Sequence, residues 1–192
     1  MAKHLSSTIF TLAISSDLIR ALKTGQSIRE NNKSFDDIEV WKVARERCFG
    51  EMEGKGVDVM MNAVRGKNKD QIFAWGPSGG ETGSGFRDRV KLFVKDLNKR
   101  VLKLKERKDV KILVTSHGGF IKEFNMLLVN EYKCKMPCSN GEWGRICPNT
   151  GVSRYNITID DDGKVLDVIC TQLHFKGHLN DAEYSEPVLY GV

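Results

Sequence analysis

The stretch Val110-Lys111-Ile112-Leu113-Val114-Thr115-Ser116-His117-Gly118-Gly119-Phe120 decides the fold of this chain. It begins as an apolar run rich in β-branched residues, which is typical of a buried parallel strand. After His117 and the glycines, apolar residues recur at helical spacing, at Phe120, Phe124, Leu127 and Leu128. The sequence therefore predicts a strand that gives way to a helix at His117, as in an open α/β sheet.

The polar end of this stretch lies where open α/β sheets bind their ligands. The carboxyl ends of parallel strands face a crevice, and the free N–H groups of the following helix favour an anion there. Gly118 and Gly119 allow the backbone to approach such a ligand closely. A lone histidine in this position is more often a packed or capping residue, so the rest of the chain has to decide.

Length and composition describe an ordinary globular protein. The chain has 192 residues, of which 40% are hydrophobic and 29% charged, and this favours one domain over residues 1–192. No apolar run is long enough to span a membrane, and residues 1–7 lack a signal-peptide segment. Five cysteines at irregular spacing suit a reducing compartment. We therefore expect a cytoplasmic protein with no membrane partner.

Much of the basic character behind the net charge of +5 lies between Arg87 and Lys111. The apolar residues of this region fall at helical spacing and predict one buried helix face: Phe86, Val90, Phe93, Leu97, Val101 and Leu104. The basic residues between them are then expected to form the solvated face of that helix. Because no aromatic residues interleave with them in a base-stacking pattern, we expect a small anionic substrate and no nucleic-acid partner.

A second strand-to-helix junction lies near the N-terminus. Residues 9–14 form a short apolar run, and residues 15–17, Ser-Ser-Asp, give a helix N-cap signature before a helix from residue 18. Arg20 falls in the first turn of this predicted helix. Its guanidinium would be able to bind a phosphate bidentately in the same crevice as His117, although an exposed helix arginine is the simpler alternative.

The other segments extend the alternation of strands and helices. Residues 38–43 are predicted as a strand, residues 44–55 as a loop with three glutamates, and residues 58–64 as a short helix. Residues 155–159 and 164–171 alternate on either side of a turn and predict a β-hairpin.

A short motif suggests a different chemistry. Residues 76–80, Gly-Pro-Ser-Gly-Gly, match the G-x-S-x-G nucleophile elbow of α/β-hydrolases and make Ser78 a candidate nucleophile. An elbow turns straight into a helix, whereas here five residues separate Gly80 from the helical stripe. The only His-Gly-Gly segment, which normally precedes such a nucleophile, follows Ser78. The motif alone is therefore a weak indication.

The cysteines raise the question of a zinc site. Cys134, Cys138 and Cys147 supply three thiols, but no CxxC pair and no nearby histidine complete a set of four ligands. Free, partly buried thiols are the better interpretation, and we expect no metal.

Four motifs together resemble those of the histidine phosphatase superfamily, also called phosphoglycerate mutase-like, and they occur in the family's order. Residues 15–21, SSDLIRA, resemble its SSDLxRA segment, and residues 46–54, ERCFGEMEG, resemble its ERxxGxxEG loop. Residues 77–82, PSGGET, resemble its proline- and glycine-rich loop, and residues 116–119, SHGG, match its second histidine motif. The resemblance covers most of the chain.

Within the family the chain is most similar to the fructose-2,6-bisphosphatases. The similarity lies in residues 79–82, GGET, residues 148–153, PNTGVS, and residues 178–180, HLN. It implies a phosphomonoesterase that removes the 2-phosphate of fructose 2,6-bisphosphate, a small phosphorylated sugar, without a cofactor; this hydrolysis would lower glycolytic flux. It also implies an α/β three-layer sandwich with a mostly parallel sheet flanked by helices.

The resemblance further implies the roles of individual residues. In this family a histidine attacks the phosphoryl group, and water hydrolyses the resulting phosphohistidine. Glu46 would be the general acid and base, and His117 would stabilise the phosphoryl oxygens. Arg20 would bind phosphate, Gly118 would open the helix N-terminus to it, and Glu81 would contribute to the pocket.

The family's nucleophile has no counterpart here. The family carries it in an Arg-His-Gly motif after its first strand, and no arginine directly precedes a histidine in this sequence. Upstream of the SSDLxRA segment only His4 is available, with no room for a strand, loop and helix before the segment. We therefore expect a domain that is incomplete at its N-terminus and lacks the family's first strand, so that the neighbouring strands have unpaired edges. We also expect the chain to be inactive.

The sequence leaves three functions open. The first is a sugar bisphosphatase of this family, and the second is a non-catalytic relative that binds phosphorylated ligands or a protein partner. The third is a serine hydrolase that uses Ser78.

Overall fold

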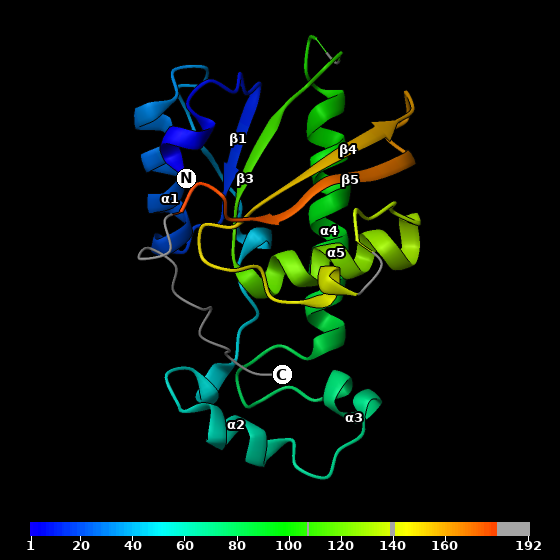
Figure 1. The fold of residues 1–192 in the computed structure, drawn as a ribbon. Coiled ribbons are helices and arrows are strands. Elements are labelled where there is room, and N and C mark those ends of the chain that lie inside the picture. The colour runs from blue at the N-terminus through cyan, green and yellow to red at the C-terminus, as the bar shows by residue number, and fades with distance from the viewer. Residues whose placement is uncertain (107, 139–140, 180–192) are drawn as a thin grey trace.

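Two separate sheets and the helices around them make up the structure, a computed structural model that describes residues 1–106, 108–138 and 141–179 (Figure 1). In chain order the elements, with η for a 3₁₀ helix, are η1 (Ala2–Leu5), β1 (Leu12–Ser15), α1 (Ile19–Asn31), β2 (Glu39–Val40), η2 (Lys42–Ala44), η3 (Gly50–Met52), α2 (Val57–Ala63), α3 (Lys69–Ala74), α4 (Gly83–Leu102), β3 (Ile112–Thr115), α5 (Gly118–Tyr132), η4 (Glu142–Gly144), β4 (Val152–Ile159) and β5 (Val165–Phe175). None of the helices in the described ranges is long and apolar enough to cross a membrane.

The larger sheet is parallel and has the strand order β2-β1-β3. β1 pairs directly with β3 along its whole length, from Leu12 opposite Ile112 to Ser15 opposite Thr115. The expectation that the strands beside a missing strand would have unpaired edges is therefore wrong where β1 and β3 meet. Backbone N–H and C=O groups require partners, and these two short apolar strands provide them for each other.

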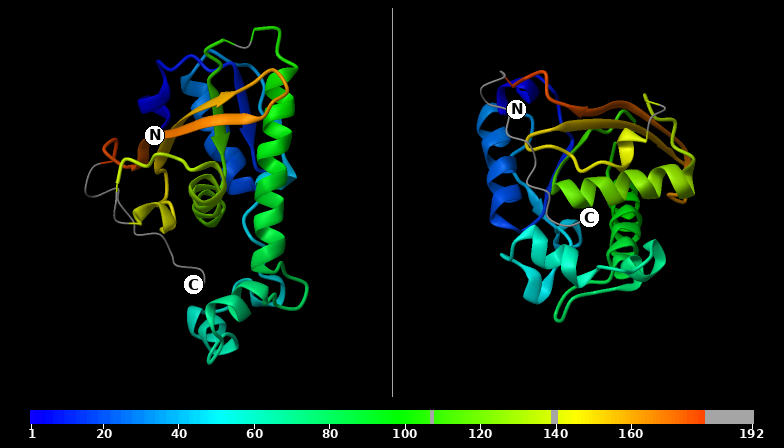
Figure 2. Two further views of the ribbon diagram at one scale, coloured as in Figure 1. Left: turned by 90° about the vertical axis from the view of Figure 1, so that its right-hand side faces the viewer. Right: turned by 60° about the horizontal axis from the view of Figure 1, so that its bottom comes forward.

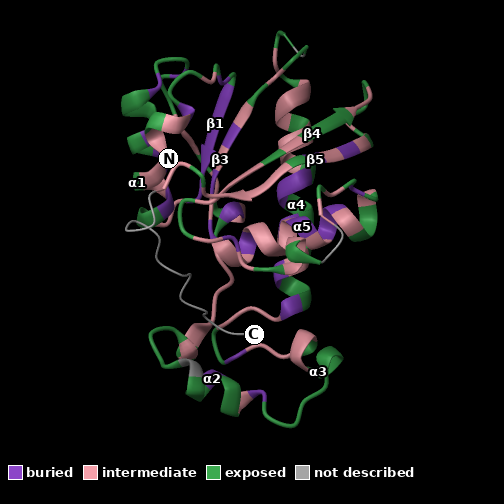
Figure 3. Cartoon of the chain, in the orientation of Figure 1, coloured by how far each residue is buried: buried purple, intermediate pink, exposed green. Residues whose placement is uncertain are grey.

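Helices cover both faces of this sheet, and the views in Figures 1 and 2 agree on their placement. Leu12 and Ile14 of β1 belong to the core that β1 shares with α4 and α5. Ala13 of β1 and Leu113 of β3 belong to a second core with η1 and α1. Since successive strand residues point to opposite faces, one short strand supplies both cores, and β1 is buried throughout (Figure 3). The predicted α/β architecture, with a parallel sheet flanked by helices, is confirmed.

The apolar stripe that predicted a long helix is the buried face of α4. Its fully buried members are Phe86, Val90 and Phe93, and Phe93 packs edge-to-face against Phe120. The helix begins at Gly83, where the Thr82 hydroxyl accepts a hydrogen bond from the Gly85 N–H at 2.9 Å. The expected five-residue gap after residue 80 is therefore wrong, because polar capping starts the helix before its first apolar residue.

The predicted strand at residues 38–43 is mostly not a strand. Only Glu39 and Val40 pair with β1, and the chain then turns into η2. The Ser116 hydroxyl donates to the Ala44 carbonyl at 2.7 Å, which ties η2 to the end of β3. The alternating pattern was misleading because these residues pack against α4 instead of extending the sheet.

The helix N-cap expected within residues 15–17 is also wrong. Leu18 occupies the N-cap position of α1, and no side chain caps the helix there. Ser16 is buried, and its hydroxyl accepts a hydrogen bond from the Leu18 N–H at 3.2 Å.

The predicted hairpin is confirmed as the antiparallel pair of β4 and β5, a sheet of its own. It packs on α5 through Val168, Cys170 and Leu128, which share one buried cluster. By contrast, α2 and α3 lie apart from both sheets, in a mostly exposed segment at the foot of Figure 1. The predicted helix at residues 58–64 is confirmed as α2.

Candidate active site

His117 lies between β3 and α5, as the sequence predicted. The residue is only 6% exposed, and its Nε2 atom lies 2.9 Å from the Ser16 hydroxyl at the end of β1. The direct pairing of β1 and β3 thus brings the two strand-to-helix junctions into contact at one edge of the sheet.

The pKa of His117 is lowered to about 4, first by burial and then by the positive charges of Arg20 and Arg89, while Asp17 acts in the opposite direction. At neutral pH the imidazole is therefore uncharged. It has one ring N–H to donate, so toward a phosphoryl oxygen it would act as a neutral hydrogen-bond donor instead of a cation.

Arg20 lies in the first turn of α1 with its side chain exposed to solvent. Because β1 pairs with β3 in parallel, α1 and α5 begin at the same edge of the sheet, and the charge of Arg20 acts to lower the pKa of His117. A neighbouring arginine at this edge, Arg45, donates from Nε to the Asp17 carboxylate at 2.6 Å and lowers the pKa of that carboxyl group. Arg45 is thus already paired, whereas no described residue forms a hydrogen bond or ion pair with the Arg20 guanidinium, which leaves it free to meet an anion.

Glu46 reaches the same edge from the loop between η2 and η3. Its Oε2 accepts a hydrogen bond from the Gly119 N–H at 2.8 Å, and its Oε1 accepts one from the Arg47 N–H at 3.0 Å. The carboxylate therefore binds one of the free backbone N–H groups at the N-terminus of α5, where negative charge is favoured. His117 and Glu46 are thus brought together by the first turn of one helix.

The two glycines after His117 are in close contact with different neighbours. A Cβ atom at Gly118 would lie 2.6 Å from the Ile146 Cγ2 and 2.9 Å from the Cys147 carbonyl oxygen. A Cβ atom at Gly119 would lie 2.5 Å from the Glu46 Oε1. Gly118 thus permits close packing of α5 against the segment before β4, and Gly119 permits the contact with the carboxylate.

This difference predicts different outcomes for two alanine substitutions. Gly118→Ala is expected to reduce the free energy of unfolding by about 1–3 kcal/mol, because backbone atoms have to move. Gly119→Ala is expected to cost less than Gly118→Ala, because the mobile end of Glu46 can move and alanine favours a helix by about 1 kcal/mol over glycine. Urea unfolding of both variants checks this, and equal losses would contradict it.

Glu81 lies at the N-terminal side of α4 and is half-buried. Its two carboxylate oxygens accept hydrogen bonds from Arg89 Nε at 2.7 Å and Nη2 at 2.6 Å, and Oε2 also accepts one from the Cys48 N–H at 3.0 Å. Burial acts to raise the pKa of Glu81, but the Arg89 and Cys48 hydrogen bonds outweigh it and the pKa is lowered. Glu81 is therefore held ionised by protein groups.

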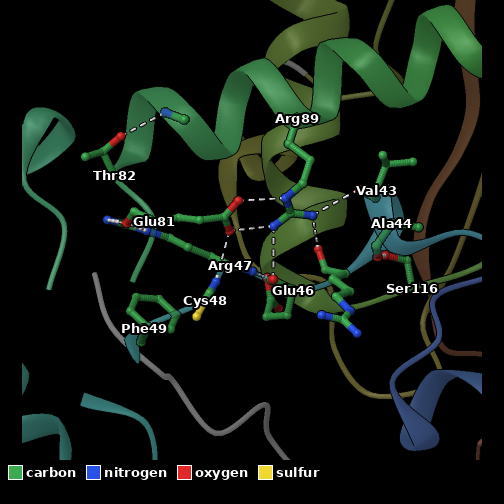
Figure 4. Close-up of polar contacts among 12 residues, drawn as sticks. Val43, Ala44, Glu46, Arg47, Cys48, Phe49, Glu81, Thr82, Arg89 and Ser116 are labelled. Atoms are coloured by element: carbon green, nitrogen blue, oxygen red, sulfur yellow. Dashed lines mark hydrogen bonds and ion pairs between the residues drawn. The ribbon is translucent and has the colours of Figure 1, made fainter. Parts of the chain in front are cut away.

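Arg89 was missed by the sequence reasoning, which assigned the basic residues of this helix to a solvated face. Its side chain is 18% exposed and points into the Glu46 loop, where Figure 4 shows it between Glu81, Glu46 and Val43. Arg87 is likewise engaged, since its Nε atom donates to Glu123 and its guanidinium lies 4.4 Å from the centre of the Phe73 ring. The solvated-face interpretation is wrong for both arginines. A signal was present, because Arg89 follows the buried Phe86 by three residues and so lies on the same side of the helix.

An open cavity of about 360 Å³ lies beside this network. Its lining residues come from η2, the Glu46 loop and α4: Lys42, Val43, Arg45, Glu46, Cys48, Glu81 and Arg89. His117 and Arg20 are not among them. The acid–base candidate Glu46 is thus accessible from the cavity, whereas His117 is buried and does not line it.

The other histidines lie elsewhere. His4 stacks against His178 and Phe175, with ring centres 5.5 and 5.1 Å apart, at the far end of β5. The His174 Nε2 atom lies 3.4 Å from the Asn125 Nδ2, and burial lowers the pKa of His174. Neither position places an imidazole beside Arg20 and Glu46.

Ser78 does not have the geometry of a nucleophile elbow. It is exposed, and it lies in a turn that follows α3 instead of a strand. Its backbone carbonyl accepts a hydrogen bond from the Glu51 N–H at 3.0 Å. An elbow depends on a strand that presents the serine at a sheet edge.

The thiols considered as zinc ligands are free cysteines. Cys134 and Cys147 are buried, and burial raises the pKa of Cys147 to about 12. Within the described ranges no group of three or more His, Cys, Asp or Glu side chains is arranged to hold a metal ion.

Comparison with known proteins identifies the family to which the chain belongs. The model of the "Histidine phosphatase superfamily (branch 1)" matches residues 1–171. The chain belongs to the histidine phosphatase superfamily. It is 27% identical to fructose-2,6-bisphosphatase TIGAR of Xenopus tropicalis, over 94% of this chain and 82% of the relative. It is also 27% identical to TIGAR B of Danio rerio, over 96% of this chain and 83% of the relative.

A solved member of similar fold is a mycobacterial glucosyl-3-phosphoglycerate phosphatase in complex with VO3. It superimposes with a TM-score of 0.67 over 89% of this chain and 79% of the solved chain, at 19% identity. The likeness confirms the phosphoglycerate mutase-like fold inferred from the motifs.

Within this family fold, Glu46 binds the first turn of the helix that follows His117, and Arg20 lies on the helix that begins at the same edge of the sheet. Gly118 lies next to His117 but packs against residues 146–147. Glu81 connects to the group through Arg89.

Proposed function

We propose that this chain carries the sugar-phosphate site of a TIGAR-like fructose-2,6-bisphosphatase, directed at the 2-phosphate of fructose 2,6-bisphosphate. One observation carries the proposal: the pairing of β1 and β3 brings the strand-to-helix junction before Arg20 beside the junction at His117, and Glu46 binds the first turn of the helix after His117. Membership of the family and the names of the TIGAR relatives support the substrate class. We also propose that the protein is cytoplasmic. Hydrolysis of fructose 2,6-bisphosphate at a complete site of this kind would lower glycolytic flux.

A complete site of this kind, with a nucleophilic histidine, would pass the phosphoryl group through two steps. A histidine nitrogen forms a bond to phosphorus as the bond to the sugar oxygen breaks, and the Glu46 carboxylic acid gives its proton to that oxygen. The oxygen of a water molecule then forms a bond to phosphorus as the phosphorus–nitrogen bond breaks and releases the histidine, and the Glu46 carboxylate takes a proton from that water. Arg20 pairs with the phosphoryl charge, and the His117 N–H and the α5 N-terminus at Gly118 stabilise its oxygens.

We propose further that this chain binds its ligand without turning it over. The 192 residues contain no Arg-His pair, and the described histidines other than His117 lie outside the site. Binding and charge stabilisation remain available to Arg20, His117 and Glu46, but the covalent route is not. Binding without turnover is also the behaviour expected of a non-catalytic relative that binds phosphorylated ligands, which is the second function that the sequence left open.

The experiment that tests the proposed site is calorimetric titration of the chain with fructose 2,6-bisphosphate. We expect binding, and we expect Arg20→Ala to weaken it by about 10- to 100-fold, because one charge-assisted contact to a phosphate is lost. Arg29→Ala serves as the matched control, because Arg29 is also an exposed arginine of α1 but lies in its last turn. Absence of binding, or equal weakening by both substitutions, would contradict the proposal.

A further inference from the structure

The Arg89 guanidinium is saturated with hydrogen bonds. Nη1 donates to the carbonyls of Val43 at 3.0 Å and Arg45 at 2.7 Å, and Nη2 donates to the carbonyl of Glu46 at 3.0 Å. Nε and Nη2 also donate to the Glu81 carboxylate, at 2.7 and 2.6 Å. Figure 4 shows this arrangement from the side of the loop. One side chain therefore holds three backbone carbonyls and a carboxylate.

The three carbonyls belong to the segment that carries Glu46. Around Glu46 the chain has no helix or strand that would fix its backbone, since η2 ends at Ala44 and η3 begins at Gly50. A rigid, planar guanidinium with donors at fixed angles is suited to fixing this backbone, because little side-chain conformational entropy is lost for each hydrogen bond formed. The hydrogen bonds of Arg89 therefore fix the backbone at a point where no helix or strand does so.

The base of Arg89 is as firmly held as its tip. It projects from α4, a helix of 20 residues whose apolar face is buried in the main core. Its guanidinium lies 4.9 Å from the centre of the Phe86 ring, and the ion pair with Glu81 keeps its charge compensated in a half-buried place. The guanidinium is thus supported by the core and by Glu81 in addition to the carbonyls of the loop.

We propose that Arg89 is the positioning residue for Glu46, with Glu81 as the counter-ion that holds Arg89. The backbone of Glu46 is fixed by Arg89, and its side chain then reaches the Gly119 N–H beside His117. Glu81 uses both oxygens on Arg89, and this makes it a support of the acid–base group more than a ligand for sugar phosphate. The catalytic meaning of this position rests on the function proposed above, but the geometric claim does not.

The hydrogen exchange rate of the Gly119 amide, measured by NMR without ligand, tests the proposal. Glu46→Ala sets the rate for a Gly119 amide that has lost its carboxylate acceptor. We expect the Gly119 amide of both Arg89→Lys and Arg89→Met to exchange at least about 10-fold faster than in the wild type, toward the rate of Glu46→Ala. In the lysine variant a single ammonium cannot hold three carbonyls and a carboxylate together. Arg87→Met is the matched control on the same helix, and we expect it to leave the rate within about twofold, because Arg87 contacts α5 and α3 but not the loop.

Thermal unfolding of each variant separates positioning from folding. Arg89→Lys keeps the charge beside Glu81, and we expect it to unfold cooperatively while the Gly119 amide is already exposed to exchange. The proposal is overturned if the folded Arg89 variants keep the wild-type rate, or if Arg87→Met raises it equally. It is also overturned if Arg89→Lys does not fold, because Arg89 would then be a residue of the fold. Since no ligand is added, none of these outcomes depends on whether fructose 2,6-bisphosphate binds.

Discussion

The 192-residue chain is expected to hydrolyse fructose 2,6-bisphosphate at least about 10⁴-fold more slowly than TIGAR of Xenopus tropicalis measured alongside it. The reason is that no arginine-histidine pair occurs in the sequence, and a histidine of that pair is the nucleophile that the family resemblance implies. Removing the nucleophile of a covalent mechanism leaves binding and electrostatic stabilisation, and these account for only part of the acceleration. His117 cannot take over that role where it lies, because it is enclosed and shares its Nε2 atom with Ser16.

Acid-quench trapping provides the more direct measurement. Substrate labelled in the 2-phosphate is mixed with the chain and quenched, and the protein is assayed for acid-labile label. We expect no label on this chain and a labelled TIGAR in the parallel reaction. Stoichiometric labelling of this chain would contradict the prediction, and peptide mapping would then identify the histidine that acts as nucleophile.

The stability of the fold is expected to fall as the pH drops from about 6.5 to about 4, and His117 is expected to account for up to about 3 kcal/mol of the loss. Its folded pKa of about 4 lies below the value of about 6.5 in the unfolded chain. Between these values the unfolded chain binds a proton that the folded protein does not. The contribution of His117 to the free energy of unfolding is therefore fully present above about pH 6.5 and is lost as the pH falls through this window.

Urea unfolding at several pH values, with His117→Gln for comparison, isolates this contribution. Glutamine can still hydrogen bond to the Ser16 hydroxyl but does not titrate, so the variant is expected to lose less stability on acidification than the wild type. Burial also lowers the pKa of His174, which acts in the same direction in both proteins and cancels in the comparison. Parallel pH dependences for wild type and variant would contradict the prediction.

Periodicity was sufficient for the elements that bury a regular apolar face. The run before His117 and the stripe from Phe86 predicted β3 and α4, because burial selects residues at the period of the structure. It failed where polar contacts decide the structure. Thr82 starts α4 early through a cap, and the segment after Val40 turns into η2 to pack against α4.

The same division applies to the site. The motifs pointed to Glu46 and His117, which lie far apart in sequence but are joined through the N-terminus of α5. Arg89 was overlooked because its partners are set by the fold. Its nearest hydrogen-bond partner in sequence is Glu81, eight residues earlier, and the residues whose carbonyls it binds are more than 40 residues away.

By itself, the sequence determined the family, the fold class and the residue types of the candidate site. It specified an α/β chain with a histidine, a glutamate and an arginine in the family's motifs, and no arginine-histidine pair. Only the tertiary structure decided that β1 and β3 pair directly, that His117 is buried against Ser16, and that Arg89 fixes the loop of Glu46. The physical reason is that backbone pairing and desolvation depend on which segments meet in space, and local residue patterns do not encode those meetings.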